Sequence, residues 1–588
     1  MEKKPKQENR SYGDRKPYDD RKPAGDRKPY GDRKPAGDRK PYGDRTPAGD
    51  RKPYGEHKPV GDRKPYGDRK PAGDRKPYGE HKPVGDHKPY GEHKPVGDHK
   101  PYGEHKPVGD HKPYGEHKPA EERRGPYGRP AQPRPQQRVA PAYPSVTSRK
   151  VALEIFGDVM HKDAYAALSL DERLSKTNLT QLDKRFCASL VYRTLENLIR
   201  IDYVLGFFLK DADALEPQVR DILRISACQL LFHDRIPENA VVDEAVKLTR
   251  ALGLEGLTGL TNAVLRALVR GKDDIQYPAP EEGARYLSIM FSVPLWLAEK
   301  LLAAYGPELA KDICAYRTES HYTVVRPNLA RMDDAAFEAL LKKKVWEVER
   351  GAAAHAYRVR MASEIARDAD YLAGNFSIQG ESSMLAAQAA DVRPGMQVLD
   401  CCAAPGGKTA YLAECMNGTG RVYAWDVHDH RVALLRAMQK RLGLDNVRPA
   451  VRDATALRED MRGTMDVVLL DAPCSGLGVM DDKPDIKYRA SAESVRELAA
   501  LQEKLLDTCC QYVRRGGALV YSTCSLLPEE NGEQIGRFLE KHPEFALSAL
   551  PDTIDEKIRA RQTAQGLQLL PCRDGVEGFF IARLRRVK

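Results

Sequence analysis

The segment MQVLDCCAAPGGKTAYLAE (396–414) combines a short apolar run, a loop with two adjacent glycines and a helical pattern. The apolar run ends at Asp400 and is typical of a buried strand. Pro405, Gly406 and Gly407 permit a tight turn whose backbone N–H groups face outward, because glycine tolerates conformations that other residues avoid. Lys408 then begins a helix. This order of strand, turn and helix predicts a ligand site beyond the carboxyl end of the strand.

Three further apolar runs follow this segment: RVYAWD (421–426), MDVVLLD (465–471) and GALVYST (517–523). Helical patterns separate them, and strands that alternate with helices are typical of a doubly wound parallel sheet. We therefore predict a Rossmann-like α/β domain over residues 384–588. The last stretches, FALSAL, LQLLP and GFFIARLRR, predict an antiparallel strand pair at one edge of the sheet.

The glycine loop does not match the phosphate-binding Walker pattern, because Cys402 stands where that pattern needs glycine. The second strand ends at Asp426, where an acidic residue can bind both hydroxyls of a ribose. Asp453 follows the next strand and could accept the amino group of an adenine. These residues predict an adenosine-containing ligand but do not separate a dinucleotide from S-adenosylmethionine. Either acid could instead act as a strand-end or helix-cap residue.

Two cysteines follow successive strands of the predicted sheet: Cys474 in DAPCSG and Cys524 in STCS. Carbon 5 of cytosine is a poor nucleophile, and a thiolate that adds to carbon 6 enables carbon 5 to attack a methyl donor. The carbon 5 proton must then leave and the thiolate must be expelled, which requires a base near the ring. A cytosine that enters such a pocket must first leave its stack. The two thiols therefore predict methylation of cytosine at carbon 5.

The surroundings of the two cysteines suggest different roles. Cys524 lies immediately before a helix predicted to begin near Pro528, and a helix N-terminus lowers the pKa of a thiol. Asp471 precedes Cys474 on a polar loop and could contact the nitrogen 3 edge of the ring or the cofactor. A buried structural thiol is the ordinary alternative for one cysteine alone. Two cysteines at successive strand ends favour a functional pair.

The rest of the chain predicts three more regions. Residues 1–146 repeat with a six-residue step, as in GDRKPY, and their regular prolines and lack of large aliphatic residues predict a disordered tail and linker. Residues 147–272 have apolar residues at helical spacing and predict an all-helical bundle. Residues 273–383 predict linker helices and a small α/β subdomain of ferredoxin or RRM type. The tail could be a solubilising extension or a weak RNA tether.

The chain has 588 residues and a net charge of +10, and the tail accounts for this excess, so the folded part is about neutral. Net charge therefore does not show that the folded part binds nucleic acid. The 11 cysteines form no C-x-x-C pairs, and neither they nor the tail histidines predict a metal site. Without a signal peptide or an apolar run of about 18 residues, the sequence predicts a soluble cytoplasmic protein that does not bind membranes.

The motifs CAAPGGK, DAPCSG and STCS closely resemble those of the RNA 5-methylcytosine methyltransferases of the RsmB/Sun family. The helical region resembles the NusB-type RNA-binding domain of this family, notably in IPENAVVDEAVKLTR (236–250). The segment from HYTVVRPN to FSIQGESSMLAAQ resembles its small RNA-contacting subdomain. The resemblance covers about residues 148–588. It implies methylation of 16S ribosomal RNA, before full assembly of the subunit, with S-adenosylmethionine as cofactor; we further expect a monomer.

The resemblance also implies roles for individual residues. In this family the cysteine after threonine is the nucleophile and the cysteine after proline assists product release, which correspond to Cys524 and Cys474. The implied cofactor-binding residues are Cys402, Ala403, Ala404, Pro405, Gly406, Gly407, Lys408, Asp426, Asp453 and Asp471. Three residues depart from the family pattern without touching the chemistry: Arg193, Pro327 and Gly380. Gly380 replaces a frequent acidic residue and could alter how the RNA-facing loop is held.

Three alternatives stay open at this point. The same chemistry could act on tRNA or on another ribosomal site. A non-catalytic RNA-binding factor is a different class of protein, although the intact cysteines and glycine loop argue against it. Methylation of uracil at carbon 5 needs one nucleophile and a carboxylate base, so the presence of two cysteines disfavours it.

Overall fold

The computed structural model describes residues 147–318, 322–344, 346–360 and 365–588, so the predicted disordered tail (1–146) lies outside the described residues. The first described part is helical throughout. Its helices are α1 (Ser148–His161), α2 (Ala166–Ser175), α3 (Gln181–Glu196), α4 (Leu198–Gly206), α5 (Pro217–Phe232), α6 (Glu238–Ala251) and α7 (Thr258–Gly271). Residues at helical spacing, such as Val151 and Ile155 of α1, pack in a shared apolar core. The predicted all-helical bundle is confirmed.

Helices α8 (Ala284–Phe291) and α9 (Leu295–Ala315) lead into a small antiparallel sheet. Its strand order is β2-β3-β1-β4. The strands are β1 (Thr323–Pro327), β2 (Glu347–Arg350), β3 (Tyr357–Arg360) and β4 (Phe376–Ile378). Phe337 and Leu341 of α10 (Asp334–Lys342) fill the core of this sheet. The predicted small α/β subdomain is thus present, and β2 is an additional strand whose four residues are exposed and show no alternation.

The C-terminal sheet has the strand order β10-β12-β9-β8-β5-β6-β7, where β10 is Phe545–Leu547 and β12 is Phe579–Arg586, and β11 (Leu567–Leu569) pairs with β12. Its parallel strands are β5 (Gln397–Asp400), β6 (Arg421–Asp426), β7 (Val447–Val451), β8 (Met465–Asp471) and β9 (Val513–Thr523). Chain order reverses between β5 and β8, and such a switch point opens a crevice at the carboxyl ends of the strands. The predicted doubly wound sheet is confirmed.

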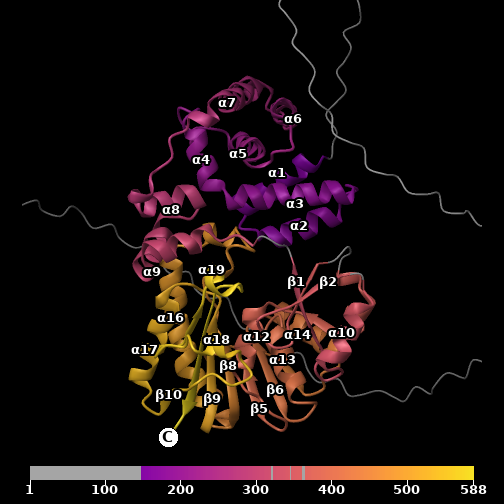
Figure 1. Ribbon diagram of the computed structural model, residues 1–588, viewed down its shortest axis with the longest axis vertical. Helices are drawn as coiled ribbons and strands as arrows, with labels where there is room; N and C mark the ends of the chain where they lie inside the picture. The colour runs from indigo at the N-terminus through magenta and orange to yellow at the C-terminus, as the bar shows by residue number, and fades with distance from the viewer. Residues whose placement is uncertain (1–146, 319–321, 345, 361–364) are drawn as a thin grey trace, which may run out of the picture. The chain divides into compact units, whose positions relative to one another are not determined.

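Successive residues of each strand enter two different cores. In β5, Val398 packs with α12 (Glu381–Gln388), α13 (Gly407–Cys415) and α14 (Asp429–Leu442), whereas Leu399 packs with α16 (Ala492–Cys509) and α17 (Gly532–Lys541). Side chains alternate between the two faces of a strand, so these two residues enter cores on opposite faces of the sheet. Helices therefore cover both faces (Figure 1). This double burial explains why the strands are nearly continuous apolar runs.

The antiparallel edge is larger than the predicted strand pair. Strand β12 (Phe579–Arg586) pairs with β9, and both β10 (Phe545–Leu547) and β11 (Leu567–Leu569) pair with β12. The antiparallel part therefore has three strands. Its central strand places the residues just before β12 beside the end of β9, next to Cys524.

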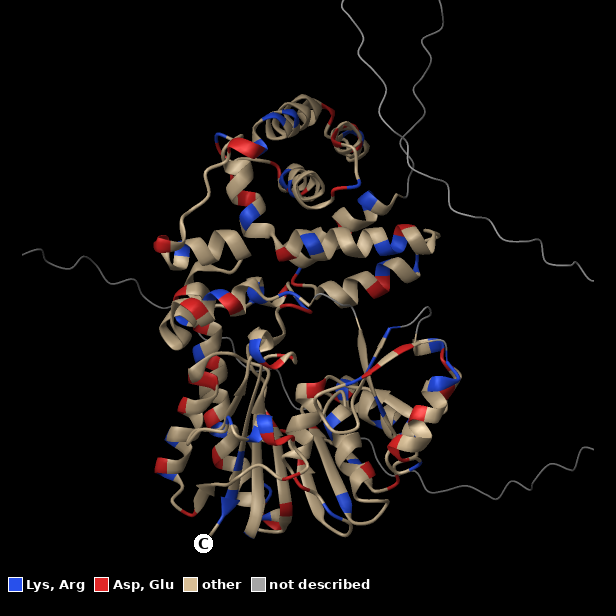
Figure 2. Cartoon of the chain, in the orientation of Figure 1, with Lys and Arg blue, Asp and Glu red and all other residues tan. Residues whose placement is uncertain are grey.

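Charges of both signs are interspersed over the described residues, as Figure 2 shows. This mixture agrees with the expectation that the folded part is about neutral. None of the helices in the described ranges has the length and apolar character that crossing a bilayer requires.

Candidate active site

The two cysteines of the predicted site lie side by side. Strands β8 and β9 pair in parallel with Asp471 opposite Ser522, so the loops that follow them begin at the same level. The Sγ atoms of Cys474 and Cys524 are 3.4 Å apart, and both residues are partly exposed. One small ring above this position could contact both sulfurs.

The two thiols have opposite electrostatic environments. A hydrogen bond from the Cys474 side chain lowers the pKa of Cys524, and the ammonium groups of Lys408 and Lys483 lower this pKa further. The pKa of Cys474 is raised, first by the same hydrogen bond and then by burial. When the pair loses a proton, these shifts favour the negative charge on Cys524 and the remaining proton on Cys474.

The helix expected near Pro528 is different in the structure. A three-residue 3-10 turn covers Pro528–Glu530, and the α-helix α17 begins only at Gly532. The pKa of Cys524 is lowered as expected, but its cause is the neighbouring thiol and two lysines rather than the end of an α-helix.

A cavity of about 330 Å³ lies at the carboxyl end of β5. All seven residues of the predicted loop line it: Cys402, Ala403, Ala404, Pro405, Gly406, Gly407 and Lys408. Gly406 has a φ of +114°, and a Cβ atom there would lie 2.7 Å from the Cε of Met438. The loop thus needs glycine both for its backbone conformation and for its close packing on α14.

Asp471 is the only one of the three predicted cofactor acids among the residues that line this cavity. Its Oδ2 atom accepts a hydrogen bond of 2.8 Å from Lys408 Nζ, and its Oδ1 atom accepts one of 2.8 Å from Ser522 Oγ. The buried Asp426 instead forms an ion pair of 3.2 Å with Arg431, which also donates to the carbonyl oxygen of Ala404. Asp426 therefore lies near the loop but is held by a protein cation.

Asp453 is exposed and contacts its own loop. Its Oδ1 atom accepts hydrogen bonds from the backbone N (2.8 Å) and the Oγ1 (2.7 Å) of Thr455, and these bonds lower the pKa of Asp453. This local turn corresponds to the strand-end role considered from the sequence.

Two residues of the cavity were missed by sequence reasoning about the site. Asp400 is buried, accepts a hydrogen bond from Thr409 at 2.7 Å, and has an Oδ1 atom without a hydrogen-bond partner among the described residues. Its position at the end of a strand was a signal that could have found it. Lys483 lines the same cavity and lowers the pKa of Cys524, but nothing in its local sequence marks it.

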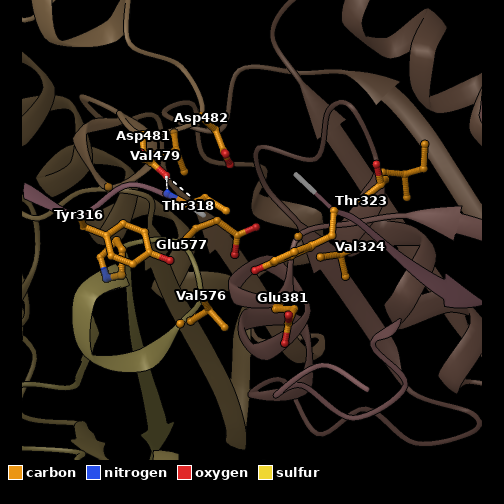
Figure 3. A pocket seen from close by; sticks show the side chains of 16 residues that line it. Tyr316, Thr318, Thr323, Val324, Glu381, Val479, Asp481, Asp482, Val576 and Glu577 are labelled. Atoms are coloured by element: carbon orange, nitrogen blue, oxygen red, sulfur yellow. Dashed lines mark hydrogen bonds between the residues drawn. The ribbon is translucent and has the colours of Figure 1, made fainter. Parts of the chain in front are cut away.

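A second cavity, of about 300 Å³, shares Ile378 and Gly380 with the first. Figure 3 shows the carboxylate of Glu577 inside it, with Tyr316 on one side and Thr318 hydrogen-bonded to Asp481. A Cβ atom on Gly380 would lie 2.1 Å from Glu577 Oε1. The side chain of Glu577 thus occupies the space that a larger residue at position 380 would need, and Glu577 also accepts from the backbone N of Ser382.

Comparison with known proteins bears on this geometry. Residues 387–585 match the model of the family described as 16S rRNA methyltransferase RsmB/F, and residues 146–270 match that of the NusB family. The probable ribosomal RNA small subunit methyltransferase B of Bacillus subtilis is 35% identical over 440 residues, which cover 74% of this chain and 98% of that protein. The chain belongs to the RsmB/F family of 16S rRNA methyltransferases.

Other RsmB/F relatives span the same region. The ribosomal RNA small subunit methyltransferase B of Thermus thermophilus is 30% identical over 448 residues, which cover 75% of this chain and 98% of that protein. The solved structure titled PH0851 superposes with a TM-score of 0.63 at 26% identity, and covers 75% of this chain and 99% of that one. As an RsmB/F methyltransferase, the chain acts on ribosomal RNA with S-adenosylmethionine as methyl donor.

The residues around the first cavity fit this cofactor. The unpaired Oδ1 of Asp400 offers a buried acceptor that the ammonium group of an amino acid could satisfy. The loop with Gly406 and Gly407 presents backbone next to the cavity without side chains that would fill it. The site therefore has both an acceptor for a cationic group and open space beside the glycine loop.

Proposed function

We propose that this enzyme methylates carbon 5 of a cytosine in 16S ribosomal RNA through a covalent bond between Cys524 and the RNA. The observation that carries the proposal is the 3.4 Å contact between the sulfurs of Cys474 and Cys524, beside the cavity that the glycine loop lines. Direct methylation of an amino or hydroxyl group needs no thiol, whereas methylation at carbon 5 of a pyrimidine requires a nucleophile at carbon 6.

Cys524 acts first in this reaction. The Cys524 thiolate, which the hydrogen bond from Cys474 and two nearby lysines stabilise, adds its electron pair to carbon 6 of the cytosine. The electrons of the bond between carbons 5 and 6 then become available at carbon 5. S-adenosylmethionine, when bound, would supply the electrophilic methyl group for carbon 5 and would leave as S-adenosylhomocysteine.

Cys474 acts second. Once the Cys524 sulfur is bonded to carbon 6, it carries no charge, so the main cause that raised the pKa of Cys474 is gone. Cys474 can then lose its proton to water and accept the proton from carbon 5. The electrons of that carbon–hydrogen bond re-form the ring double bond and expel the Cys524 thiolate. The resting pair, with the proton on Cys474, is thereby restored.

Four residues hold the cofactor and substrate side of the site in this proposal. Asp400 accepts from the ammonium group of the cofactor, since its Oδ1 is buried without a partner among the described residues. Lys408 and Asp471 form a hydrogen-bonded pair between the glycine loop and the end of β8. Asp426 binds the ribose of the cofactor, as the resemblance to the family implies. Its carboxylate must then contact both the ribose and Arg431.

Single-cysteine variants test the covalent step. Cys524→Ala should abolish both methyl transfer and any RNA–protein adduct. Cys474→Ala should allow the adduct to form but not to resolve, so an RNA-linked band should persist under denaturing electrophoresis. Cys572→Ala, which changes a partly exposed thiol on α19 (Pro571–Asp574), is the matched control and should behave as wild type. An adduct in Cys524→Ala would overturn the proposal.

The substrate is tested separately. Bisulfite sequencing of RNA from a deletion strain should show the loss of one 5-methylcytosine in 16S ribosomal RNA. An unchanged 16S pattern with a lost site in tRNA or 23S RNA would keep the chemistry and contradict the substrate.

A further inference from the structure

Glu530 connects the two cysteine loops. A serine follows each cysteine, and the Glu530 Oε2 atom accepts a hydrogen bond from the Oγ of both Ser475 and Ser525. The Oε1 atom accepts from the backbone N of Ser475 at 2.9 Å. The two serine hydroxyls are themselves 3.2 Å apart. One carboxylate thus joins the loop after β8 to the loop after β9, one residue beyond each sulfur.

A second element supports the same carboxylate. Gln502 of α16 donates from Nε2 to Glu530 Oε1 at 3.0 Å and to the carbonyl oxygen of Pro473 at 2.9 Å. The hydroxyl of Tyr521 donates to the backbone carbonyl of Glu530 at 2.7 Å. The connection between the two loops is therefore anchored in the sheet and in a helix that covers it.

Glu530 is fully buried, and its carboxylate contacts neutral donors in the interactions found among the described residues. A buried carboxylate without a cation is unfavourable unless hydrogen bonds compensate for lost hydration. A neutral side chain could join the loops without this cost. The negative charge of Glu530 beside the cysteines is therefore not needed for packing and indicates an electrostatic role.

We propose that Glu530 is a positioning residue that holds Cys474 and Cys524 at contact distance and keeps the shared proton on Cys474. The proposal rests on the two-cysteine mechanism described above. The charge of Glu530 acts on the Cys474 thiol, and the hydrogen bonds of Glu530 to the two serines fix the separation of the loops.

The charges around the pair agree with this assignment. After the hydrogen bond to Cys524, burial and the Cys524 charge, the charge of Glu530 also raises the pKa of Cys474. Lys408 and Lys483 instead lower the pKa of Cys524, which Asp471 opposes. The charged neighbours thus differ between the two thiols: Glu530 raises the pKa of Cys474, whereas at Cys524 two lysines act against Asp471.

The test uses Glu530→Gln, which keeps the size of the side chain and removes its charge. Glu529→Gln is the matched control, because Glu529 is the adjacent residue and pairs with Lys300 away from the thiols. The full chain without RNA is treated with iodoacetamide over a range of pH, and alkylation of each cysteine is followed by peptide mass spectrometry. The pH midpoint for Cys474 should fall in Glu530→Gln, whereas Glu529→Gln should match wild type.

Turnover gives a second measurement. With 16S RNA as substrate, Glu530→Gln should lower kcat by about tenfold or more while KM for S-adenosylmethionine changes little, since the cofactor cavity lacks Glu530. A purely structural role would lower the melting temperature and leave the alkylation profile unchanged. That result, in a folded variant, would overturn the proposal.

Ser525→Ala keeps the test decisive if Glu530→Gln does not fold. This variant removes one donor and leaves the charge, so the Cys474 midpoint should stay near that of wild type while adduct formation at Cys524 slows. Wild-type rates of adduct formation in Ser525→Ala would contradict the positioning role. Because alkylation needs no RNA, it reports on Glu530 even if the proposed methylation of cytosine is wrong.

Discussion

Lys408 Nζ donates a hydrogen bond of 2.8 Å to Asp471 Oδ2, and this bond joins the glycine loop after β5 to the end of β8. The two strands are neighbours at the point where chain order reverses. Ser522 of β9 holds the other oxygen of Asp471. A single carboxylate therefore connects three strand ends at the border between the cofactor cavity and the cysteine pair.

Replacement of Lys408 should shift the pH dependence of the reaction. Lys408 lowers the pKa of Cys524 together with the hydrogen bond from Cys474, so Lys408→Met should raise that pKa and move the rising limb of kcat/KM to higher pH. At a fixed neutral pH, activity should fall about tenfold for each unit of this shift. Lys440→Met, which removes an exposed cation of α14, should leave the profile unchanged.

Asp400 should make cofactor binding depend on pH. Burial raises the pKa of Asp400 from 3.8 to about 7. Because this pKa is raised in the folded state, the Asp400 carboxyl group lowers the free energy of unfolding as pH rises from about 4 to about 7. A ligand with an ammonium group binds the ionised carboxylate, which forms as pH rises through about 7. The affinity for S-adenosylhomocysteine, measured by calorimetry, should therefore increase as pH rises through about 7. Asp400→Asn should bind weakly with a flat profile; an unchanged slope would exclude Asp400 as the acceptor.

Gly406→Ala should weaken both the fold and the cofactor site. The left-handed backbone costs about 1–2 kcal/mol for a residue with a Cβ atom, and that atom would also contact Met438 at 2.7 Å. Thermal unfolding should show this loss, and the Kd for S-adenosylhomocysteine should increase. Gly536→Ala in α17 has open space around the new atom and should instead raise stability by up to about 1 kcal/mol.

Arg326 and Glu414 form an ion pair between β1 and α13, and both side chains are fully buried. Removal of one partner leaves an unpaired buried charge, so Arg326→Met should destabilise the protein by about 3–5 kcal/mol. Denaturant unfolding measures this loss. The double variant Arg326→Met, Glu414→Gln should recover part of it, and equal losses in the single and double variants would argue against coupling through the pair.

The sequence allowed the strands of the C-terminal sheet to be predicted well because each is buried on both faces. Val398 and Leu399 enter different cores, and such strands appear in the sequence as continuous apolar runs. Strand β2 could not be predicted in this way, since its residues are exposed and backbone pairing with β3 alone defines it. The sequence predicted an antiparallel edge with two strands, whereas the structure has three. The pairing of such short strands depends on contacts between residues distant in the chain.

The predicted cofactor acids illustrate a second limit. Asp426, Asp453 and Asp471 all stand at or near strand ends, yet Arg431, Thr455 and Lys408 are their respective partners in the structure. Strand position alone does not show which acid faces the cavity. Asp400 and Asp471 line it, whereas Asp426 and Asp453 do not, although all four stand at or near a strand end in the sequence.

The sequence by itself determined that two cysteines follow successive strands and that a glycine loop follows the first strand of a parallel sheet, because these properties depend on local order and spacing. Tertiary structure decided that the two sulfurs lie 3.4 Å apart, that the pKa values of the two thiols shift in opposite directions, and that Glu530 joins their loops. The physical reason is that a thiol's pKa and a carboxylate's hydrogen bonds depend on neighbours in space. Those neighbours, such as Cys474 and Cys524, are separated by tens of residues along the chain.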